Sequence, residues 1–449
     1  MDFDVLAKGD LDTDSTLALD LKSKHFLGDA DLETSVELLS TKLRTRKGYL
    51  RSFTSLHMVV VTAYCNCRCE YCQASSRAPE VGLLSMSTDT ARQVVGMIFQ
   101  SPSPAIKIEF QGGEPLLNWN VVRYIVEYAE MVNVKAGKDL EFVICTNLTL
   151  IDKHHLGFLK DHGVMISTSL DGPRDLHDSN RPCRDGSSSY AAFERKLALT
   201  REIMGEYACS PLLTITRSHL GRLREVIDEY VRFGFHGAFL RSLNPYGVAK
   251  SQWDKLAYTT ADFVKAYKDA LDYIIQINLN GYRFVEYYTC LLLTRILTPF
   301  STGFVDLQSP SGAGISGVIY DFDGDVYPAD EGRMLARTGD DRFRLGNVKE
   351  DTYLGIFASD KLRELTSASC VETLPGCAWC AYHLYCGGDP IRNYVECGDI
   401  VGHRPTSEFC RKNKAIFDHL FKLIREDNSD VMDVFWSWIA NRGLEEVRL

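Results

Sequence analysis

Fourteen cysteines are the residues of this chain best suited to carry chemistry, and most of them gather in two groups. Four lie between residues 65 and 72, and six lie between residues 370 and 410. In a chain without secretory features, thiols gathered in this way favour metal sites over disulfides. The other four stand apart and are expected to be small buried hydrophobic residues, namely Cys145, Cys183, Cys209 and Cys290.

The first group reads AYCNCRCEYCQAS and places Cys65, Cys69 and Cys72 in a CxxxCxxC spacing. Three thiolates on one tight loop can ligate three irons of a 4Fe–4S cluster and leave the fourth iron open to an external ligand. A structural zinc site needs four ligands, usually in two separated pairs, and fits this spacing less well. The spacing therefore favours an iron–sulfur site.

A glycine pair follows the next apolar run, where IKIEF leads into QGGEP. Gly112 and Gly113 would let the backbone approach a ligand closely, and Glu114 adds a carboxylate beside them. Taken alone, an ordinary strand-to-helix turn explains this segment at least as well. Its interest is its position, because segments that follow successive parallel strands meet at one mouth of a barrel.

The second group reads CAWCAYHLYCGG and spaces Cys377, Cys380 and Cys386 as CxxCxxxxxC. Three further cysteines lie nearby, namely Cys370, Cys397 and Cys410. One of them would complete a four-thiolate site for zinc or for a second 4Fe–4S cluster. The spacing does not distinguish the two metals.

Six short β-branched runs alternate with amphipathic stretches and must position these groups. The expected strands begin near residues 55, 105, 140, 163, 211 and 237, and helices are expected from 90, 121, 190 and 221. This rhythm predicts an α/β fold, a partial (β/α)6 TIM-type barrel. The chemistry of such a barrel lies where strands end, which is where the cysteine loop and QGGEP fall.

Four regions are expected along the chain. The basic run KLRTRKGYLR ends an N-terminal segment that either contacts a peptide or is a solvated helix face. A hairpin turning at Asp323 and Gly324 precedes the second cysteine group. The regions are 1–52, the N-terminal segment; 53–262, the barrel; 263–310, a helical bridge; and 311–449, a cysteine-rich domain with a C-terminal helix.

Composition limits the classes of partner. A net charge of −10 argues against a nucleic-acid surface, which is built from clustered lysine and arginine. No apolar stretch approaches the length of about 20 residues that a membrane span needs. The start MDFDVLAKGD is acidic, unlike a signal peptide. We therefore expect a cytoplasmic protein that binds neither nucleic acid nor membrane.

Together, the CxxxCxxC loop and the GGEP segment resemble the radical S-adenosylmethionine (SAM) superfamily over residues 55–260. The resemblance implies that Cys65, Cys69 and Cys72 hold a 4Fe–4S cluster, which cleaves SAM to a 5′-deoxyadenosyl radical. Cys67 departs from the family loop and is either a bystander or a competing ligand. The SAM-contacting residues implied are Tyr71, Gly112, Gly113, Glu114, Asn147, Ser169, Arg181 and Arg217. Ser169 or Asp171 could equally cap a helix.

The second cysteine array is similar to the SPASM module of peptide-modifying radical SAM enzymes. That similarity implies one auxiliary 4Fe–4S cluster held by Cys377, Cys380, Cys386 and Cys410, with Cys397 as the alternative fourth ligand. The family pattern has further cysteines where this chain has Ala329 and Pro390, and an upstream pair that is missing around Ser311. These departures imply that a second auxiliary cluster is absent.

Flanking segments such as LKSKHFL and DEGRMLA resemble the radical SAM maturase of the His-Xaa-Ser peptide system. This resemblance implies a ribosomally made precursor peptide as substrate and an external electron donor of flavodoxin or ferredoxin type. A side-chain carbon crosslink of cyclophane type is the preferred product. Thioether formation, epimerisation or maturation of a partner enzyme are alternatives, and a zinc-stabilised binding protein is the alternative from another class.

Overall fold

A nine-stranded sheet forms the centre of the molecule in a computed structural model that describes residues 2–24, 26–28, 32–74, 76–79 and 84–448. Its order is β11-β10-β9-β1-β2-β3-β4-β5-β7. Six neighbouring strands are parallel and confirm the six predicted ones. They are β1 (Leu56–Thr62), β2 (Ala105–Gly112), β3 (Asp139–Cys145), β4 (Met165–Ser169), β5 (Cys209–Ile215) and β7 (Leu240–Ser242).

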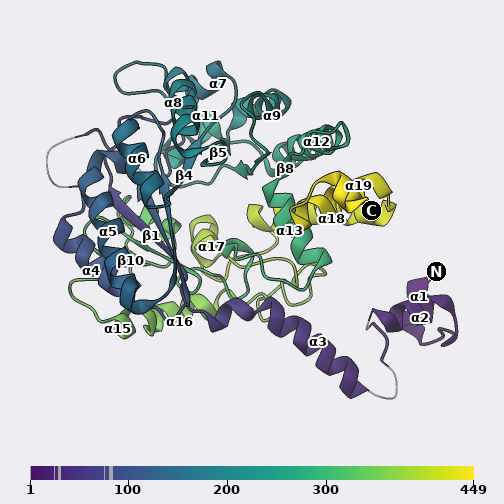
Figure 1. Cartoon of the computed structure of the whole chain (residues 1–449). Helices are drawn as coiled ribbons and strands as arrows, with labels where there is room; N and C mark the ends of the chain where they lie inside the picture. Colours follow the sequence, from purple (N-terminus) through teal and green to yellow (C-terminus); the bar gives the residue numbers. More distant parts are fainter. Residues whose placement is uncertain (1, 25, 29–31, 75, 80–83, 449) are drawn as a thin grey trace.

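Helices cover the outer face of these strands (Figure 1). Four of them match the predicted helices: α4 (Thr88–Ile98), α5 (Trp119–Ala136), α8 (Ser189–Met204) and α9 (Leu223–Arg232). In α9 the buried residues Leu223, Val226, Ile227 and Tyr230 recur at helical spacing and form its inner face. Two shorter helices were not predicted, α6 (Lys153–Asp161) and α7 (Arg174–Asn180), because neither is long enough to show a clear apolar period.

The sheet continues beyond the barrel through β9 (Gly317–Tyr320), which pairs in parallel with β1. The predicted hairpin joins β9 to β10 (Asp325–Tyr327), and Gly324 supplies the positive φ of 98° at its turn. β11 (Gly346–Asn347) closes this edge. One sheet therefore runs across the boundary expected near residue 310. On the opposite side, β6 (Gly237–Ala238) leaves the barrel and pairs with β8 (Val285–Glu286).

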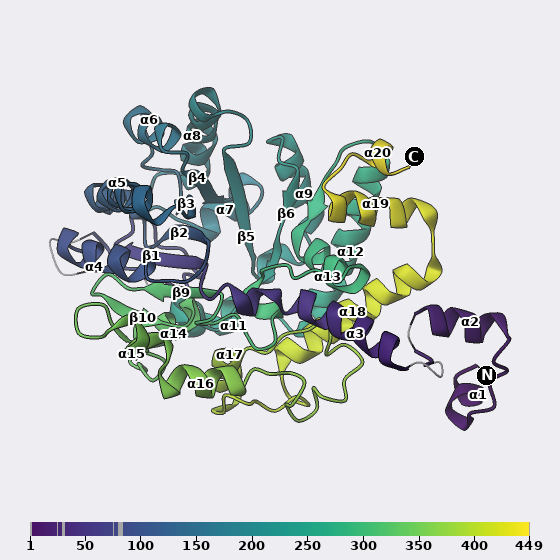
Figure 2. The same ribbon diagram turned by 60° about the horizontal axis from the view of Figure 1, so that its bottom comes forward.

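Helices that follow the barrel form a second layer with the C-terminal helices (Figure 2). They are α12 (Thr260–Leu279), α13 (Tyr287–Leu297), α18 (Glu408–Glu426) and α19 (Ser429–Ala440). Three further helices lie outside this layer, namely α10 (Gly247–Ser251), α11 (Trp253–Leu256) and α17 (Pro390–Cys397). α12 packs against α18 and α19. Trp438 of α19 is buried and its indole donates to Asn278 of α12, whereas Trp436 is 39% exposed. In the described ranges, no helix is long and apolar enough to cross a membrane.

The first helices form an arm that projects from the body (Figures 1 and 2). It comprises α1 (Asp2–Lys8), α2 (Thr16–Ser23) and α3 (Leu32–Arg46). Two residues of the basic run, Arg46 and Lys47, bind the body, whereas Lys42, Arg44 and Arg51 are exposed. The Arg46 guanidinium donates to the carbonyls of Leu384 at 2.8 Å and Arg295 at 2.9 Å, and Lys47 pairs with Glu372 at 2.7 Å. These residues anchor the arm to the body.

Candidate active site

A cavity of about 270 Å³ lies where the barrel strands end, and the first cysteine group forms part of its wall. Cys65, Cys67, Cys69 and Cys72 all line it. The predicted SAM contacts that line the same cavity are Tyr71, Gly112, Gly113, Asn147, Ser169 and Arg181. The parallel sheet thus brings together residues more than 100 positions apart. Glu114 and Arg217 do not line it.

The glycine pair lies against the start of the cysteine loop. Gly113 donates its N–H to Thr62 O at 2.9 Å, and Glu114 donates its own to Tyr64 O at 2.8 Å. A Cβ atom on Gly113 would lie 2.1 Å from Tyr64 O, and one on Gly112 would lie 2.2 Å from Thr62 O. No side chain fits there. The glycines therefore fix the position of the cysteine loop, in addition to lining the cavity.

Glu114 is fully buried, and its carboxylate points at the next strand end. It accepts hydrogen bonds from Thr146 Oγ1 at 2.7 Å and from the N–H of Asn147 at 2.8 Å. Burial raises the pKa of Glu114 to about 7, although these bonds lower it. The side-chain amide nitrogen of Asn147, Nδ2, lies 3.9 Å from Cys65 Sγ and 3.6 Å from Cys67 Sγ. Glu114 is thus a positioning residue for Asn147.

Asp171 orders two of the cavity residues. Its Oδ2 accepts from the Tyr71 hydroxyl at 2.6 Å and from Arg181 Nε at 3.0 Å, and the Arg181 guanidinium stacks over the Tyr71 ring. Burial is the main reason why the pKa of Tyr71 is well above its ordinary value. Arg181 Nη1 lies 4.0 Å from Cys69 Sγ, so a positive charge faces the thiol group. The sequence left two roles open for Asp171, as part of a pocket-lining SLDG segment at 169–172 or as a helix cap.

Two hydroxyl residues at the end of β4 face the cavity. Ser169 and Thr168 both line it, and the buried Thr168 hydroxyl has no hydrogen-bond partner within the described residues. A buried hydroxyl without a partner is rare and suits a ligand that supplies one. Arg217 lies elsewhere: it is exposed and donates to Ala257 O at 2.7 Å.

Cys67 is turned toward Cys183, a residue that the sequence treats as solitary. Their sulfurs are 3.6 Å apart, and both side chains are buried. Cys65, Cys69 and Cys72 remain for a cluster, and soft thiolates are the ligands that iron–sulfur clusters require. The thiols share one wall without converging on a point: across the described ranges, no three Cys, His, Asp or Glu side chains meet closely enough to hold a metal ion.

The second cysteine group lies between α16 (Asp360–Ser367) and the first turn of α18. Burial raises the pKa of Cys386 to about 11, and the Cys377 and Cys410 thiols add to this increase. The Asn413 side-chain amide, which lies 3.7 Å from the Cys386 sulfur, lowers the same pKa. Burial raises the pKa of Cys410 as well, with smaller contributions from Cys377 and Cys380. Cys397 is exposed at the end of α17, and its Sγ contacts Asn393 O at 3.2 Å. Cys377 and Cys410 thus lie within electrostatic reach of Cys386, whereas, in the residues that the structure describes, no such influence links Cys397 to the group.

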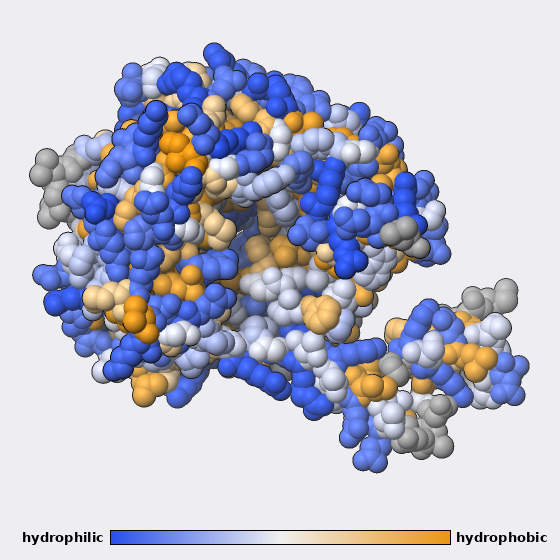
Figure 3. Space-filling view, viewed as in Figure 1, coloured by the Kyte–Doolittle hydropathy of each residue, from blue (hydrophilic) through white to orange (hydrophobic). Residues whose placement is uncertain are grey.

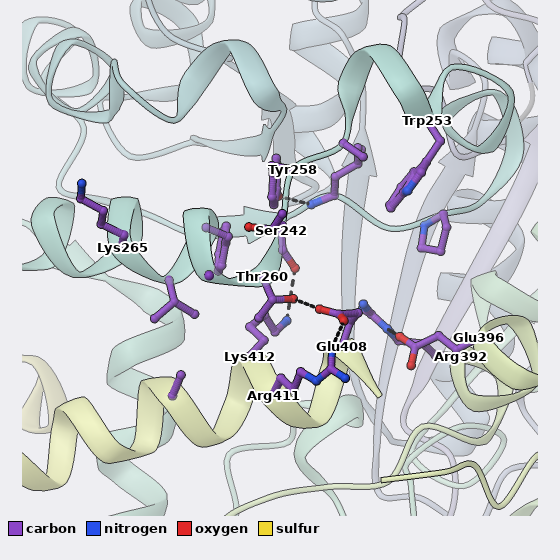
Figure 4. A pocket seen from close by; sticks show the side chains of 18 of the residues that line it. Ser242, Trp253, Tyr258, Thr260, Lys265, Arg392, Glu396, Glu408, Arg411 and Lys412 are labelled. Atoms are coloured by element: carbon purple, nitrogen blue, oxygen red, sulfur yellow. Dashed lines mark hydrogen bonds and ion pairs between the residues drawn. The ribbon is translucent and has the colours of Figure 1, made fainter. Parts of the chain in front are cut away.

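Two further hollows lie beside the cysteine cavity. An inner chamber of about 40 Å³ shares Arg241 with that cavity. An outer groove of about 1140 Å³ shares Ser242, Phe263, Arg392 and Lys412 with the chamber. Figure 3 shows a face that is hollowed near its centre, and Figure 4 shows the groove from close by, between α12 and α18. The three hollows are therefore adjacent, from the cysteine cavity through the chamber to the groove.

Residues 59–236 match the model of the Radical SAM superfamily. Over 84% of its length the chain is 25% identical to the cysteine-type anaerobic sulfatase-maturating enzyme of Clostridium perfringens, of which it covers 98%. Among solved structures, the fold resembles native anSMEcpe with bound AdoMet and Kp18Cys peptide, with a TM-score of 0.69, 21% identity, and coverage of 83% of this chain and 98% of that one. The fold also resembles Streptococcus suis SuiB bound to precursor peptide SuiA, with a TM-score of 0.57 and 14% identity. That match covers 84% of this chain and 81% of the SuiB chain.

Proposed function

Because the chain carries a radical SAM domain and is therefore a radical SAM enzyme, we propose that it modifies a ribosomally made precursor peptide. The preferred product is a crosslink to a side-chain carbon of that peptide. The observation that carries the proposal is an outer groove of about 1140 Å³, large enough for a peptide segment, which lies next to the chamber that adjoins the cavity of the cysteine triad. A protein that used its cysteines only for structural zinc would not need such a groove beside them.

The cysteine cavity supplies the binding groups of such an enzyme. Cys65, Cys69 and Cys72 would hold the 4Fe–4S cluster, which when bound supplies the electron that cleaves SAM reductively. Arg181, oriented by Asp171, offers a cation for the carboxylate of SAM, and Thr168 offers a hydroxyl without a partner among the described residues.

The second cysteine group would hold one auxiliary cluster. We assign its ligands as Cys377, Cys380, Cys386 and Cys410, because Cys377 and Cys410 raise the pKa of Cys386, Cys377 and Cys380 raise that of Cys410, and Cys397 is exposed at a helix end. Ala329 and Pro390 stand where a second auxiliary cluster would need thiolates. An external flavodoxin or ferredoxin would deliver the electron.

One alternative substrate has specific support. The relative with which this chain aligns over 84% of its length is named as a sulfatase-maturating enzyme, so a partner enzyme could be the protein modified. The proposal of a small precursor peptide is supported by the likeness to SuiB bound to its precursor peptide. Thioether formation and epimerisation are further products that the same radical chemistry could give.

Anaerobic reconstitution tests the enzyme and its substrate separately. With SAM and dithionite, the full chain should release 5′-deoxyadenosine, and Cys65→Ala, Cys69→Ala and Cys72→Ala should each abolish it. Cys67→Ala is the matched control and should retain cleavage, because Cys67 faces Cys183. Co-expression with small open reading frames beside the gene should yield a peptide lighter by about two hydrogen masses, as a new carbon bond requires. A peptide of unchanged mass, with a modified sulfatase instead, would favour the alternative.

A further inference from the structure

The outer groove has an excess of positive charge, although the chain as a whole carries −10. Five of its lining side chains are basic and two are acidic. Both acidic side chains are already bonded to arginine within the groove. Arg392 Nε donates to Glu396 at 2.8 Å, and Arg411 donates to Glu408 (Figure 4). Three lysines remain without a carboxylate.

Two of these lysines, Lys265 and Lys268, lie one turn apart on α12. In the described part of the chain, neither makes a hydrogen bond or an ion pair; Figure 4 shows Lys265 extending away from its helix. The third, Lys412 of α18, donates to Ser242 Oγ at 3.2 Å and lies over the Tyr288 and Phe409 rings. Burial lowers the pKa of Lys412 to about 7, so it adds little positive charge. The two α12 lysines are thus the unpaired cations of the groove, and a hollow focuses their potential on its ligand.

The floor of the groove is apolar. Leu243, Trp253, Phe263 and Val264 line it together with smaller apolar residues. Apolar burial gives affinity without selecting charge, whereas the lysines on the rim select it. An occupant with apolar side chains and carboxylates on its other face satisfies both features.

The inner chamber carries both signs of charge. Asp306, Glu331 and Asp389 line it together with Arg241, Arg392 and Lys412. The excess of positive charge is therefore a feature of the outer groove, where both carboxylates are already paired with arginine.

From this charge pattern we infer that the groove binds an acidic, apolar segment of the peptide substrate. The inference rests on the proposed function and names the class of peptide. Lys265 and Lys268 pair with its carboxylates, and Trp253 and Phe263 contact its apolar side chains. The modified residue lies farther along the peptide, beyond the acidic segment and toward Arg241, where the chamber meets the cysteine cavity.

The test uses the full reconstituted enzyme and three fluorescein-labelled octapeptides. All three share one apolar pattern, and their four polar positions are all Glu, all Gln or all Lys. In fluorescence anisotropy at low salt, the Glu peptide should bind roughly tenfold more tightly than the Gln peptide, because two or three exposed pairs together give about that factor. The preference should weaken as salt rises.

A charge-reversed groove should invert this order. In the Lys265→Glu, Lys268→Glu double variant, the Lys peptide should bind more tightly than the Glu peptide. The matched control is Lys135→Glu, Lys250→Glu, which changes the net charge equally at exposed positions outside the groove and should keep the original order. Equal affinity for all three peptides, absence of binding, or an unchanged order in the groove variant would overturn the inference. If these results came with normal release of 5′-deoxyadenosine, radical SAM activity would stand and only the groove assignment would fail.

Discussion

At the scale of single residues, the assignment of the fourth auxiliary ligand gives a direct prediction. Cys410→Ala should lower the iron content from about eight per chain to about four, because the fourth iron of the auxiliary cluster would lose its thiolate and, unlike the open iron of the first cluster, has no SAM to take its place. Cys397→Ala should leave the iron content unchanged, since its thiol is exposed and contacts only main-chain oxygens of its own segment.

Iron and acid-labile sulfide assays on anaerobically reconstituted protein check this pair of variants. Release of 5′-deoxyadenosine should continue in Cys410→Ala, because the cysteine triad lies in a separate cavity. Loss of iron in Cys397→Ala but not in Cys410→Ala would reverse the assignment. A wild-type content near four would mean that the second group holds no cluster, and twelve would mean that the departures at Ala329 and Pro390 were misinterpreted.

Residue types and spacing predicted which cysteines matter but not where each side chain points. The CxxxCxxC spacing is local, and the loop places all three thiols on one cavity wall, as local spacing can specify. The proximity of Cys67 to Cys183 depends on two loops 116 positions apart, and no local pattern encodes it. Glu114 shows the same limit: its place beside the glycines was evident, but its direction depends on Thr146 at the end of the next strand.

At the scale of secondary-structure elements, the glycine pair connects two strand ends. Gly113→Ala should destabilise the protein by about 1–3 kcal/mol, because its new Cβ would lie 2.1 Å from a backbone oxygen that cannot rotate away. The same shift would displace the start of the cysteine loop, so binding of SAM should weaken as well. Urea unfolding and equilibrium dialysis with labelled SAM measure the two effects.

Gly157→Ala is the matched control for this substitution. Gly157 lies within α6, and a Cβ atom there would meet nothing within 4 Å. Alanine favours helix over glycine by up to about 1 kcal/mol, so this variant should be as stable as the wild type or slightly more stable. Equal stability of Gly113→Ala and wild type would show that the loops can separate without cost.

The strands were easier to predict than the short helices and the connections between layers. Strands that are buried on both faces have nearly continuous β-branched runs, and these runs predicted all six barrel strands. The pairing of β9 with β1 could not be predicted, because the two strands are more than 250 positions apart and each carries a pattern compatible with several partners. The outer groove was missed for the same reason, since α12, α17 and α18 form it only after the chain has returned across the barrel.

At the scale of the whole molecule, a few residues at the base of the N-terminal arm attach it to α13 and to the second cysteine region. Besides the contacts of Arg46 and Lys47, the Tyr49 hydroxyl donates to Pro310 O at 2.9 Å. These contacts hold the barrel's first strand near α13 and near the second cysteine region. The remainder of α3 buries no residue, so it contributes little to the stability of the body.

Two truncations separate the anchor from the arm. A chain that begins at Leu32 keeps Arg46, Lys47 and Tyr49, so its melting temperature should equal that of the full chain. A chain that begins at Phe53 loses all three and should be less stable by about 2 kcal/mol or more, because the backbone carbonyls that Arg46 bonds lose their charged donor. Calorimetry on the two chains provides the comparison, and Arg46→Ala in the full chain should reproduce part of the loss. Equal stability of both truncated chains would show that these contacts form without stabilising the body. If removal of residues 1–31 alone already lowered the melting temperature, the stabilising contacts would lie farther out along the arm.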